Sequence, residues 1–499
     1  MRVPGSESKL TRRGLVAAGG GALAALLVGR SPARAAALLG ADSPPPVARS
    51  PYRSRPDLQP PPITVATPAS GNAPGYVFLS PFDITAKPGA APIPPSQSHV
   101  GPLIVDSTGE PVWFLPLGKG AAMGLRVQRY RGKPVLTWFE GAVLGGYGGH
   151  YVVFDGTYHR VALVEAGGHG DLHEFLLTPK GTALLAIAAT VPVPGGGPPI
   201  VEGVVQERAV DSGKVLFEWH SLDHVPVAES YRSDVTPDGN IDYFHLNSID
   251  VDSDGSYLVS ARHTSTVYKV DRRSGAILWR LGGKASDFSF ADGAAFAFQH
   301  DARRQHDGTI TLFDNGATGP GADRVEPASR PLRLRIDATR KTATLEREYV
   351  PEQPRSSDAM GNLQVLPDGG VFVGWGTVGG WTEFAPDGSV RFDASFADGR
   401  ASYRVYRFPW RGVPDSVPAI ALERTSAGLT AHVSWNGATE VAAWRLLGGR
   451  APRALSRLAQ ARRVGFETSL SVPSAPAHVA VAALDVRGKE LARTATILV

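Results

Sequence analysis

The chain has 499 residues, of which 20 % are charged and 42 % hydrophobic, a composition that excludes a disordered, collagen-like or coiled-coil protein. It contains no Cys, which excludes a disulfide scaffold, a thiolate metal site and a cysteine nucleophile. The formal net charge is +4, but residues 1–35 alone hold six Lys/Arg and one Glu. The remainder is close to neutral, so the composition gives no reason to expect a nucleic-acid-binding protein.

Residues 1–35 have the pattern of an export signal. Arg12-Arg13 precedes an uncharged, Gly-rich run at 14–29, and an A-x-A site ends at Ala35. A basic start, a short apolar stretch and such a site are typical of a secretory signal, and adjacent arginines favour the twin-arginine route. We expect cleavage after Ala35 and a secreted or cell-envelope (periplasmic) protein. An uncleaved anchor is the alternative, although the 16-residue run is shorter than the roughly 20 residues that span a bilayer.

Residues 36–62 are Pro-rich and are predicted to form a flexible linker. From 63 to 411, short apolar runs alternate with Gly-containing turns, and two kinds of hairpin recur. One reads D-x-x-G-x-x-x-W, at 106–113, 211–219 and 271–279; the other lacks the Trp and is centred on Gly181, Gly255, Gly308 and Gly369. A repeat of two different hairpins is a four-stranded unit, the blade of a β-propeller. A β-sandwich followed by a second β-domain is the alternative.

After residue 412 the pattern changes to six strand-like runs with Trp435 and Trp444 among them. This density of short strands predicts an immunoglobulin or fibronectin-like β-sandwich over 412–499, which we interpret as an accessory domain.

Eleven of the thirteen histidines lie between residues 99 and 306, so any imidazole chemistry is expected in the first β-domain. His173, His245 and His300 each stand at the start of the first strand of a hairpin without Trp. Equivalent positions on successive blades converge on the central channel, so these rings and Arg262 are expected to face one another. The cluster could bind a metal ion or act on an anionic group; Arg262 favours the anion, because a guanidinium repels a dication. Alternatively, each His satisfies a buried hydrogen bond.

Several motifs occur together as an ordered set over about 75 residues. They are FHLNSI at 244–249, LVSARHTS at 258–265, GAILWRLGG at 275–283, QHDAR at 299–303 and LFDNG at 312–316. This set resembles the arylsulfate sulfotransferase family that does not use 3′-phosphoadenosine phosphosulfate, in the branch common in actinobacteria and fungi. The resemblance implies an all-β fold, with a six-bladed β-propeller over 63–411 ahead of the predicted sandwich.

The resemblance also implies a secreted enzyme that moves a sulfuryl group from an aryl sulfate to a phenol in a ping-pong cycle. It makes His300 the nucleophile that carries the group as N-sulfohistidine, Arg262 the ligand of the sulfate oxygens, and His245 and His173 supporting catalytic residues. Asn247, His263 and Asp314 are then substrate-binding neighbours. No cofactor, metal or nucleic acid is expected, and no stable membrane insertion after cleavage. Two alternatives stay open: a propeller that binds a glycan or protein without turnover, and a lyase or metal-dependent hydrolase.

Overall fold

The structure is a computed structural model that describes residues 52–83, 98–141, 147–317 and 324–499. The predicted export signal at 1–35 lies outside the described residues. Within them, the secondary structure consists of strands and three short 3-10 helices, η2 (Ser221–Asp223), η3 (Val227–Glu229) and η4 (Gly376–Val378). The all-β prediction is therefore confirmed. No helix in this part of the chain combines the length and the apolar character needed to cross a bilayer.

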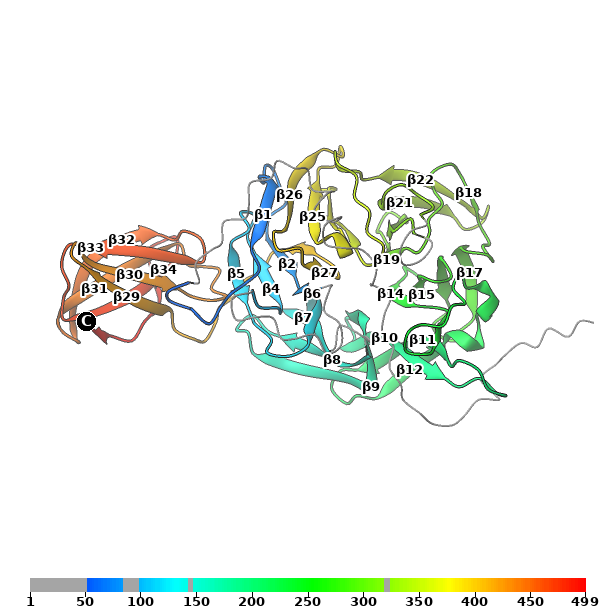
Figure 1. The fold of residues 1–499 in the computed structure, drawn as a ribbon, viewed down its shortest axis with the longest axis horizontal. Helices are drawn as coiled ribbons and strands as arrows, with labels where there is room; N and C mark the ends of the chain where they lie inside the picture. Colours follow the sequence, from blue (N-terminus) through cyan, green and yellow to red (C-terminus); the bar gives the residue numbers. More distant parts are fainter. Residues whose placement is uncertain (1–51, 84–97, 142–146, 318–323) are drawn as a thin grey trace, which may run out of the picture.

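The strands between residues 63 and 408 form five large sheets and one two-stranded sheet around a common centre (Figure 1). In chain order they are β1 (Ile63–Thr67), β2 (Tyr76–Leu79), β3 (Pro81–Phe82), β4 (Leu103–Val105), β5 (Pro111–Phe114), β6 (Ala121–Tyr130), β7 (Lys133–Gly141), β8 (Tyr147–Phe154), β9 (Arg160–Leu177), β10 (Thr182–Val191), β11 (Ile200–Ala209), β12 (Val215–His220), β13 (Ile241–Asp242), β14 (Leu246–Val251), β15 (Tyr257–Ala261), β16 (Thr266–Val270), β17 (Ile277–Gly282), β18 (Ser289–Phe290), β19 (His300–Arg304), β20 (Ile310–Asp314), β21 (Arg330–Asp337), β22 (Thr342–Glu348), β23 (Asn362–Val365), β24 (Val371–Gly374), β25 (Gly380–Phe384), β26 (Val390–Phe396), β27 (Ala401–Ser402) and β28 (Tyr406–Phe408).

The two kinds of hairpin occupy different places in these sheets. Hairpins without Trp join the first two strands of a unit, in the pairs β9–β10, β14–β15, β19–β20 and β23–β24. The Trp hairpins join the last two strands, in the pairs β4–β5, β11–β12 and β16–β17. Their turn glycines have positive φ, for example 67° at Gly213 and 85° at Gly308, which a side chain would disfavour. The repeat is thus a four-stranded antiparallel unit.

One sheet is longer than a single unit, running in the order β12-β11-β10-β9-β8-β7-β6. Its strand β9 has 18 residues, pairing with β8 through its first part and with β10 through its last. Dividing the sheet at β9 gives two four-stranded units. The total of six blades stays a prediction.

Strands from the two ends of this region pair with each other and close the ring. β1 pairs with β26, β2 with β28 and β3 with β27, all antiparallel. This pairing joins the first and last strands of the first β-domain, so the sheets form a closed ring around their common centre.

The predicted flexible linker is packed where the structure describes it, from residue 52 onward. Leu58 is 1 % exposed, and the Tyr52 ring lies 4.5 Å from that of Phe466. Ser54 donates its backbone N–H to Glu467 Oε2 over 2.6 Å. Apolar burial and a carboxylate acceptor therefore fix this stretch against the C-terminal region, and the prediction of a free tether is wrong for residues 52–62.

The C-terminal region has two sheets, drawn to one side of the ring in Figure 1. Their strands are β29 (Ala419–Thr425), β30 (Gly428–Ser434), β31 (Ala443–Ala451), β32 (Ala454–Arg462), β33 (Glu467–Val472), β34 (His478–Leu484), β35 (Glu490–Arg493) and β36 (Ile497–Leu498). One sheet has the order β29-β30-β33 and the other β32-β31-β34-β35, with β36 on β34. A single core that includes Trp435 and Trp444 contains residues of both sheets. Assignment to the immunoglobulin or fibronectin type stays a prediction.

Candidate functional site

The histidines predicted to converge do lie close together. His173 is in β9, His245 directly precedes β14, and His300 begins β19. Ring centroids are 4.9 Å apart for His173 and His245, and 4.5 Å apart for His245 and His263. The Tyr403 ring links this group to His300, at 5.5 Å from His173 and 6.4 Å from His300. We refer to His173, His245, His263, His300 and Arg262 as the imidazole cluster.

His300 is 1 % exposed, and its tautomer is fixed by its partners. The Asn315 amide nitrogen donates to the carbonyl oxygens of Ser357 and Met360, at 2.9 and 3.0 Å. The Asn315 amide oxygen must therefore accept from His300 Nδ1, 2.6 Å away. His300 Nε2 carries the lone pair and accepts the Met360 N–H over 3.2 Å. The ring is held as a neutral imidazole with its lone pair on Nε2.

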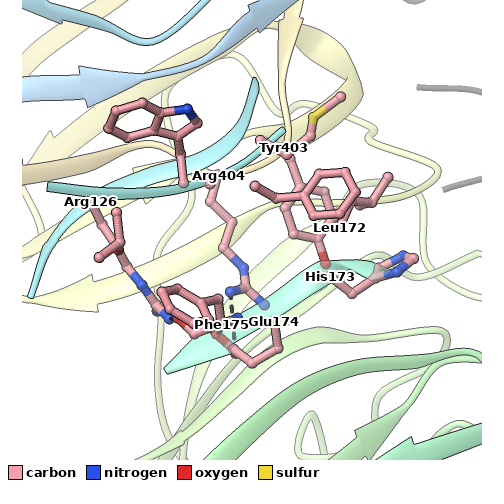
Figure 2. A pocket seen from close by; sticks show the side chains of 12 residues that line it. Arg126, Leu172, His173, Glu174, Phe175, Tyr403 and Arg404 are labelled. Atoms are coloured by element: carbon pink, nitrogen blue, oxygen red, sulfur yellow. Dashed lines mark hydrogen bonds and ion pairs between the residues drawn. The ribbon is translucent and has the colours of Figure 1, made fainter. Parts of the chain in front are cut away.

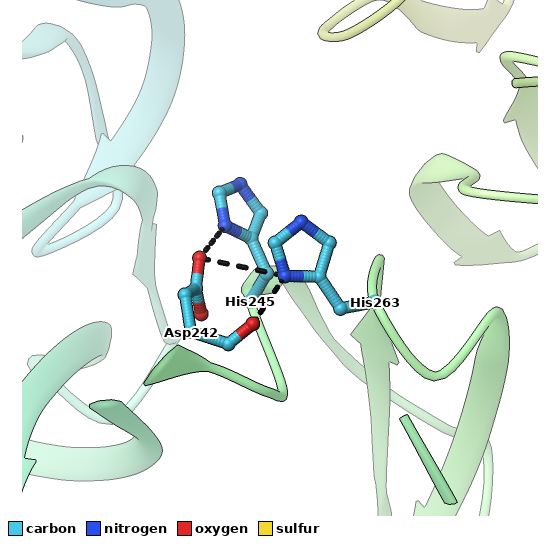
Figure 3. Close-up of side chains that lie close together, drawn as sticks. All are labelled: Asp242, His245 and His263. Atoms are coloured by element: carbon cyan, nitrogen blue, oxygen red, sulfur yellow. Dashed lines mark hydrogen bonds and ion pairs between the residues drawn. The ribbon is translucent and has the colours of Figure 1, made fainter. Parts of the chain in front are cut away.

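Two carboxylates orient the more accessible rings. Asp171 Oδ1 lies 2.5 Å from His173 Nδ1, and Asp242 Oδ2 lies 2.5 Å from His245 Nδ1 (Figure 3). The side chains of His173 and His245 are 16 % and 24 % exposed. Each ring donates from Nδ1 and leaves Nε2 available, and a carboxylate behind the ring stabilises a proton that arrives there.

Arg262 is a buried cation without a carboxylate partner among the described residues. It is 5 % exposed, and its Nη2 donates to the Asp358 carbonyl oxygen over 3.0 Å. Its Nη1 donates to His263 Nε2 over 2.8 Å, while His263 Nδ1 donates to the Asp242 carbonyl oxygen over 2.6 Å. Arg262 Nε is buried, and no described residue forms a hydrogen bond with it. A buried unpaired guanidinium is unfavourable unless an anion joins it, so this position suits an oxyanion.

A second arginine, Arg232, lies close to Arg262 and was not foreseen from the sequence. The Tyr231 N–H donates to the His263 carbonyl oxygen over 2.8 Å, which places residues 231–232 against 262–263. Arg232 is 9 % exposed and pairs with Asp234, but its Nη1 is buried and has no hydrogen-bond partner within the described ranges. Two neighbouring cations, each with an unused N–H, reinforce the preference for an anion.

Burial and positive charge keep these rings neutral. Burial, followed by the charge of Arg262, holds the pKa of His300 well below the ordinary 6.5, despite the opposing hydrogen bond to Asn315. Burial also lowers the pKa of His245, against the raising effect of Asp242, and that of His263. Burial, with Arg232 next, lowers the pKa of Arg262 to about 10. Near neutral pH, His300 is uncharged while Arg262 keeps its charge.

Several residues at or next to the cluster have left-handed backbone conformations, which side chains usually avoid. The φ angles are 55° at His245, Phe298 and Asp301 and 68° at Met360. Such conformations cost of order 1–3 kcal/mol each and persist where the surroundings impose them, often at functional sites.

Three predicted substrate-binding residues have different surroundings. Asn247 donates its amide to the Gln299 carbonyl oxygen over 2.8 Å, and its buried Oδ1 has no partner among the described residues. His263 has both ring nitrogens occupied and contacts Arg262, so it is placed to position that guanidinium. Asp314 is 0 % exposed, with one oxygen accepting from the backbone of Ala297 and the other from Arg330. The polar atoms of Asp314 and His263 are thus already bonded within the fold, and contact of either residue with substrate stays a prediction.

A small pocket borders the cluster at His173. Figure 2 shows its lining, in which His173 and Tyr403 lie beside Glu174 and Arg404. Glu174 is 0 % exposed and forms ion pairs with Arg126, Arg303 and Arg404. Asp301 pairs with the same Arg303 and Arg404. We call these five residues the ion cluster.

The site also contains a possible metal-ligand set. One ligand atom each from Asp242, His245 and His263 lies within 4.8 Å of the others (Figure 3). The fit is poor, because both His Nδ1 atoms donate hydrogen bonds to Asp242 and the Arg262 guanidinium occupies the other nitrogen of His263. A metal ion would have to displace these bonds and tolerate the nearby cation, so we derive no step through one.

Four further residues complete the site: Asp171, Asp242, Asn315 and Arg232. The first three had local signals, since Asp171 and Asp242 precede His173 and His245 by two and three positions and Asn315 follows Asp314 in the LFDNG motif. Arg232 lies in the connection between β12 and β13, outside every recognised motif.

A family model described as arylsulfotransferase (ASST) matches residues 126–397. No curated protein matches the chain. Among solved structures, a Bacteroides caccae protein of unknown function is 12 % identical, with TM-score 0.40, covering 67 % of this chain and 98 % of its own. A catalytically inactive virginiamycin B lyase variant from Staphylococcus aureus, with quinupristin, is 9 % identical, with TM-score 0.33 and coverage of 75 % and 97 %. At these TM-scores the structural similarities carry no functional argument.

Proposed function

The chain belongs to the arylsulfotransferase (ASST) family, and from this premise we propose that it transfers a sulfuryl group from an aryl sulfate to a phenol through a sulfohistidine at His300. The observation that carries the proposal is a neutral, oriented His300 beside a buried guanidinium that has no anionic partner in the part of the chain that the structure describes.

In the first half-reaction, the lone pair of His300 Nε2 attacks sulfur and the bond from sulfur to the aryl oxygen breaks. The electron pair of that bond leaves with the phenolate. Arg262, with Arg232 beside it, holds the three sulfuryl oxygens, whose charge is best stabilised by donors already in place. The Met360 N–H releases Nε2 as the new N–S bond forms.

The two accessible rings serve the phenol oxygen. His173 and His245 each have Nδ1 on a carboxylate and a lone pair on Nε2, so a ring that has taken a proton from the acceptor phenol of one turnover can give it to the phenolate that departs in the next. In the second half-reaction the acceptor phenol returns a proton to this nitrogen. Its oxygen attacks sulfur, the N–S bond breaks and His300 regains its lone pair. Tyr403, between His173 and His300, is the aromatic wall nearest the phenol in this arrangement.

The arginine pair at 12–13 and the A-x-A site ending at Ala35 support export by the twin-arginine route as part of the proposal. The donor aryl sulfates and the acceptor phenols would then be compounds outside the cytoplasm.

The test is to mix the protein with 4-nitrophenyl sulfate and measure both nitrophenolate release and the mass of the intact chain. We expect a burst of nitrophenolate and a mass gain of one sulfuryl group, discharged by added phenol. His300→Asn removes the nucleophile and should abolish both signals, whereas His306→Asn, a nearby surface histidine, should keep both.

Turnover without a mass gain, or a mass gain in His300→Asn, would contradict the proposed intermediate. Binding of aryl sulfate with no turnover would favour the binding-module alternative. Activity that disappears on metal chelation and returns with a divalent ion would instead support the Asp242, His245 and His263 ligand set.

A further inference from the structure

The C-terminal region carries an unusual concentration of unpaired arginine. Residues 412–499 contain ten Lys/Arg and six Asp/Glu, and no acidic residue occurs between Glu440 and Glu467. That acid-free stretch includes β31 and β32, which form one antiparallel hairpin. None of its six arginines forms an ion pair among the described residues, and five of them belong to this hairpin: Arg445, Arg450, Arg453, Arg457 and Arg462. We call this set the arginine hairpin.

Strand register places most of these side chains on one face. Trp444 and Leu446 point into the sandwich core, so the alternate residues Arg445 and Leu447 point outward. Arg462 lies opposite Ala443 and Arg457 opposite Leu447, which puts both on the outer face with Arg445. On the neighbouring strand β34, Ala482 lies opposite Arg445. On β35, the strand after it, Arg493 lies opposite Ala482. The outer face is therefore a row of arginines above a floor of Ala and Leu, and at its β35 edge Arg493 pairs with Glu490, which lies opposite Leu484.

Several exposed arginines outside the hairpin form ion pairs, although others, such as Arg160 and Arg273, form none among the described residues, so the hairpin differs by its concentration of unpaired arginines. On the first β-domain, Arg131 pairs with Asp211, Arg335 with Glu346 and Arg340 with Asp337. The hairpin arginines instead lack carboxylates and lie several ångströms apart across adjacent strands, where the spacing is about 4.8 Å. Planar guanidinium groups in such an array match repeated sulfate, phosphate or carboxylate groups on an extended chain.

We propose that the arginine hairpin is a docking surface for an anionic polysaccharide. The floor side chains Leu447, Ala482 and Leu484 are themselves buried, so this face presents no protruding apolar group to enter a lipid bilayer. No aromatic side chain lies on it either, since Trp444 points inward, and stacking of single-stranded bases lacks a platform. The proposal is independent of the sulfuryl-transfer chemistry.

The experiment measures binding of labelled dextran sulfate to the full chain at several NaCl concentrations, with neutral dextran as the uncharged probe. We expect binding of dextran sulfate alone, weakening as salt rises. The variant Arg445→Gln/Arg457→Gln/Arg462→Gln should bind about tenfold more weakly, since each exposed charge contact contributes modestly. The control Arg131→Gln/Arg335→Gln/Arg340→Gln changes the net charge equally and should bind like wild type.

Equal losses in the two variants would overturn the proposal, because net charge alone would then explain binding. Failure of wild type to bind dextran sulfate at low salt would also overturn it, as would tighter binding to phosphatidylglycerol vesicles or to single-stranded DNA. Thermal unfolding of both variants should match wild type, and the single change Arg457→Gln gives a milder test of the same surface. Turnover of aryl sulfate should be unchanged in every variant, so this outcome is separable from the proposed function.

Discussion

The imidazole cluster, with the adjoining Tyr403, and the ion cluster share three segments of the chain yet have opposite character. His173 is followed by Glu174, His300 by Asp301, and Tyr403 by Arg404. In the ion cluster every charge has an opposite partner, whereas Arg262 in the imidazole cluster has none among the described residues. Because successive residues point to opposite sides of an extended chain, the same segments supply both.

The difference indicates a division of roles. Burial alone would raise the pKa of Glu174, but Arg303, Arg404 and Arg126 hold it well below its usual range, so the carboxylate stays charged. The ion cluster therefore anchors four backbone segments through satisfied charges, those at Arg126, Glu174, Asp301 to Arg303, and Arg404. His173 and His300 lie on two of these segments, so the imidazole cluster around them can keep an unpaired cation and strained backbone that would be costly alone.

Breaking the ion cluster should have the largest effect on stability. Glu174→Gln leaves three buried guanidinium groups facing one remaining carboxylate, Asp301. Removing one partner from a buried ion network typically costs about 3–5 kcal/mol, and we expect a loss of that size in the free energy of unfolding measured with urea. Arg340→Gln, which breaks an exposed pair with Asp337, should change the free energy of unfolding far less, because solvent screens that pair. A similar small loss in Glu174→Gln would show that the ion cluster is not an anchor.

Breaking the imidazole cluster at Arg262 should separate activity from stability. Arg262→Met removes the donor for the sulfuryl oxygens, and we expect kcat/KM for 4-nitrophenyl sulfate to fall about 100- to 1,000-fold. The free energy of unfolding should change far less than in Glu174→Gln, because loss of two hydrogen bonds is offset by removal of an unpaired buried charge. A stability loss as large as that of Glu174→Gln, or unchanged kinetics, would contradict this view of Arg262.

The sequence predicted the imidazole cluster because its members occupy equivalent places in repeated hairpins. His173, His245 and His300 could be aligned by the turn that follows each, and repeat geometry then implies that they meet. The family resemblance added Arg262 as the anion ligand. These inferences needed only strand order and periodicity, which local patterns of Gly, Asp and apolar residues encode.

The ion cluster and the occupied state of Asp314 could not be predicted this way. Glu174 and Arg404 are 230 positions apart, and no sequence motif around either residue predicts their ion pair. Asp314 stands beside Asn315 in one motif, and only side-chain direction decides that Asn315 contacts His300 while Asp314 contacts Arg330. The packing of residues 52–62 likewise depends on Glu467 and Phe466, at the far end of the chain.

The smallest predicted effect is a difference in the pH at which the two clusters titrate. The folded-state pKa values of His300, His263 and His245 are lowered, so below about pH 6.5 the unfolded chain binds protons that the folded chain refuses. The free energy of unfolding should therefore have its full value above about pH 6.5 and decline as the pH falls below it. Glu174 also has a lowered pKa, but as a carboxyl its contribution is lost only in more acidic solution, below about pH 4.5.

Unfolding with guanidinium chloride at intervals from pH 8 to pH 4 measures both losses of stability, the one due to the histidines and the one due to Glu174. His300→Asn should make the decline below about pH 6.5 shallower and leave the more acidic loss in place, since an amide cannot titrate. The transfer rate of wild type should hold down to about pH 6.5, because His300 stays neutral there. A rise in stability between pH 7 and pH 5.5 would mean that charged imidazoles are favoured in the folded state, and His300 could not then be the neutral nucleophile of a site distinct from its charged neighbours.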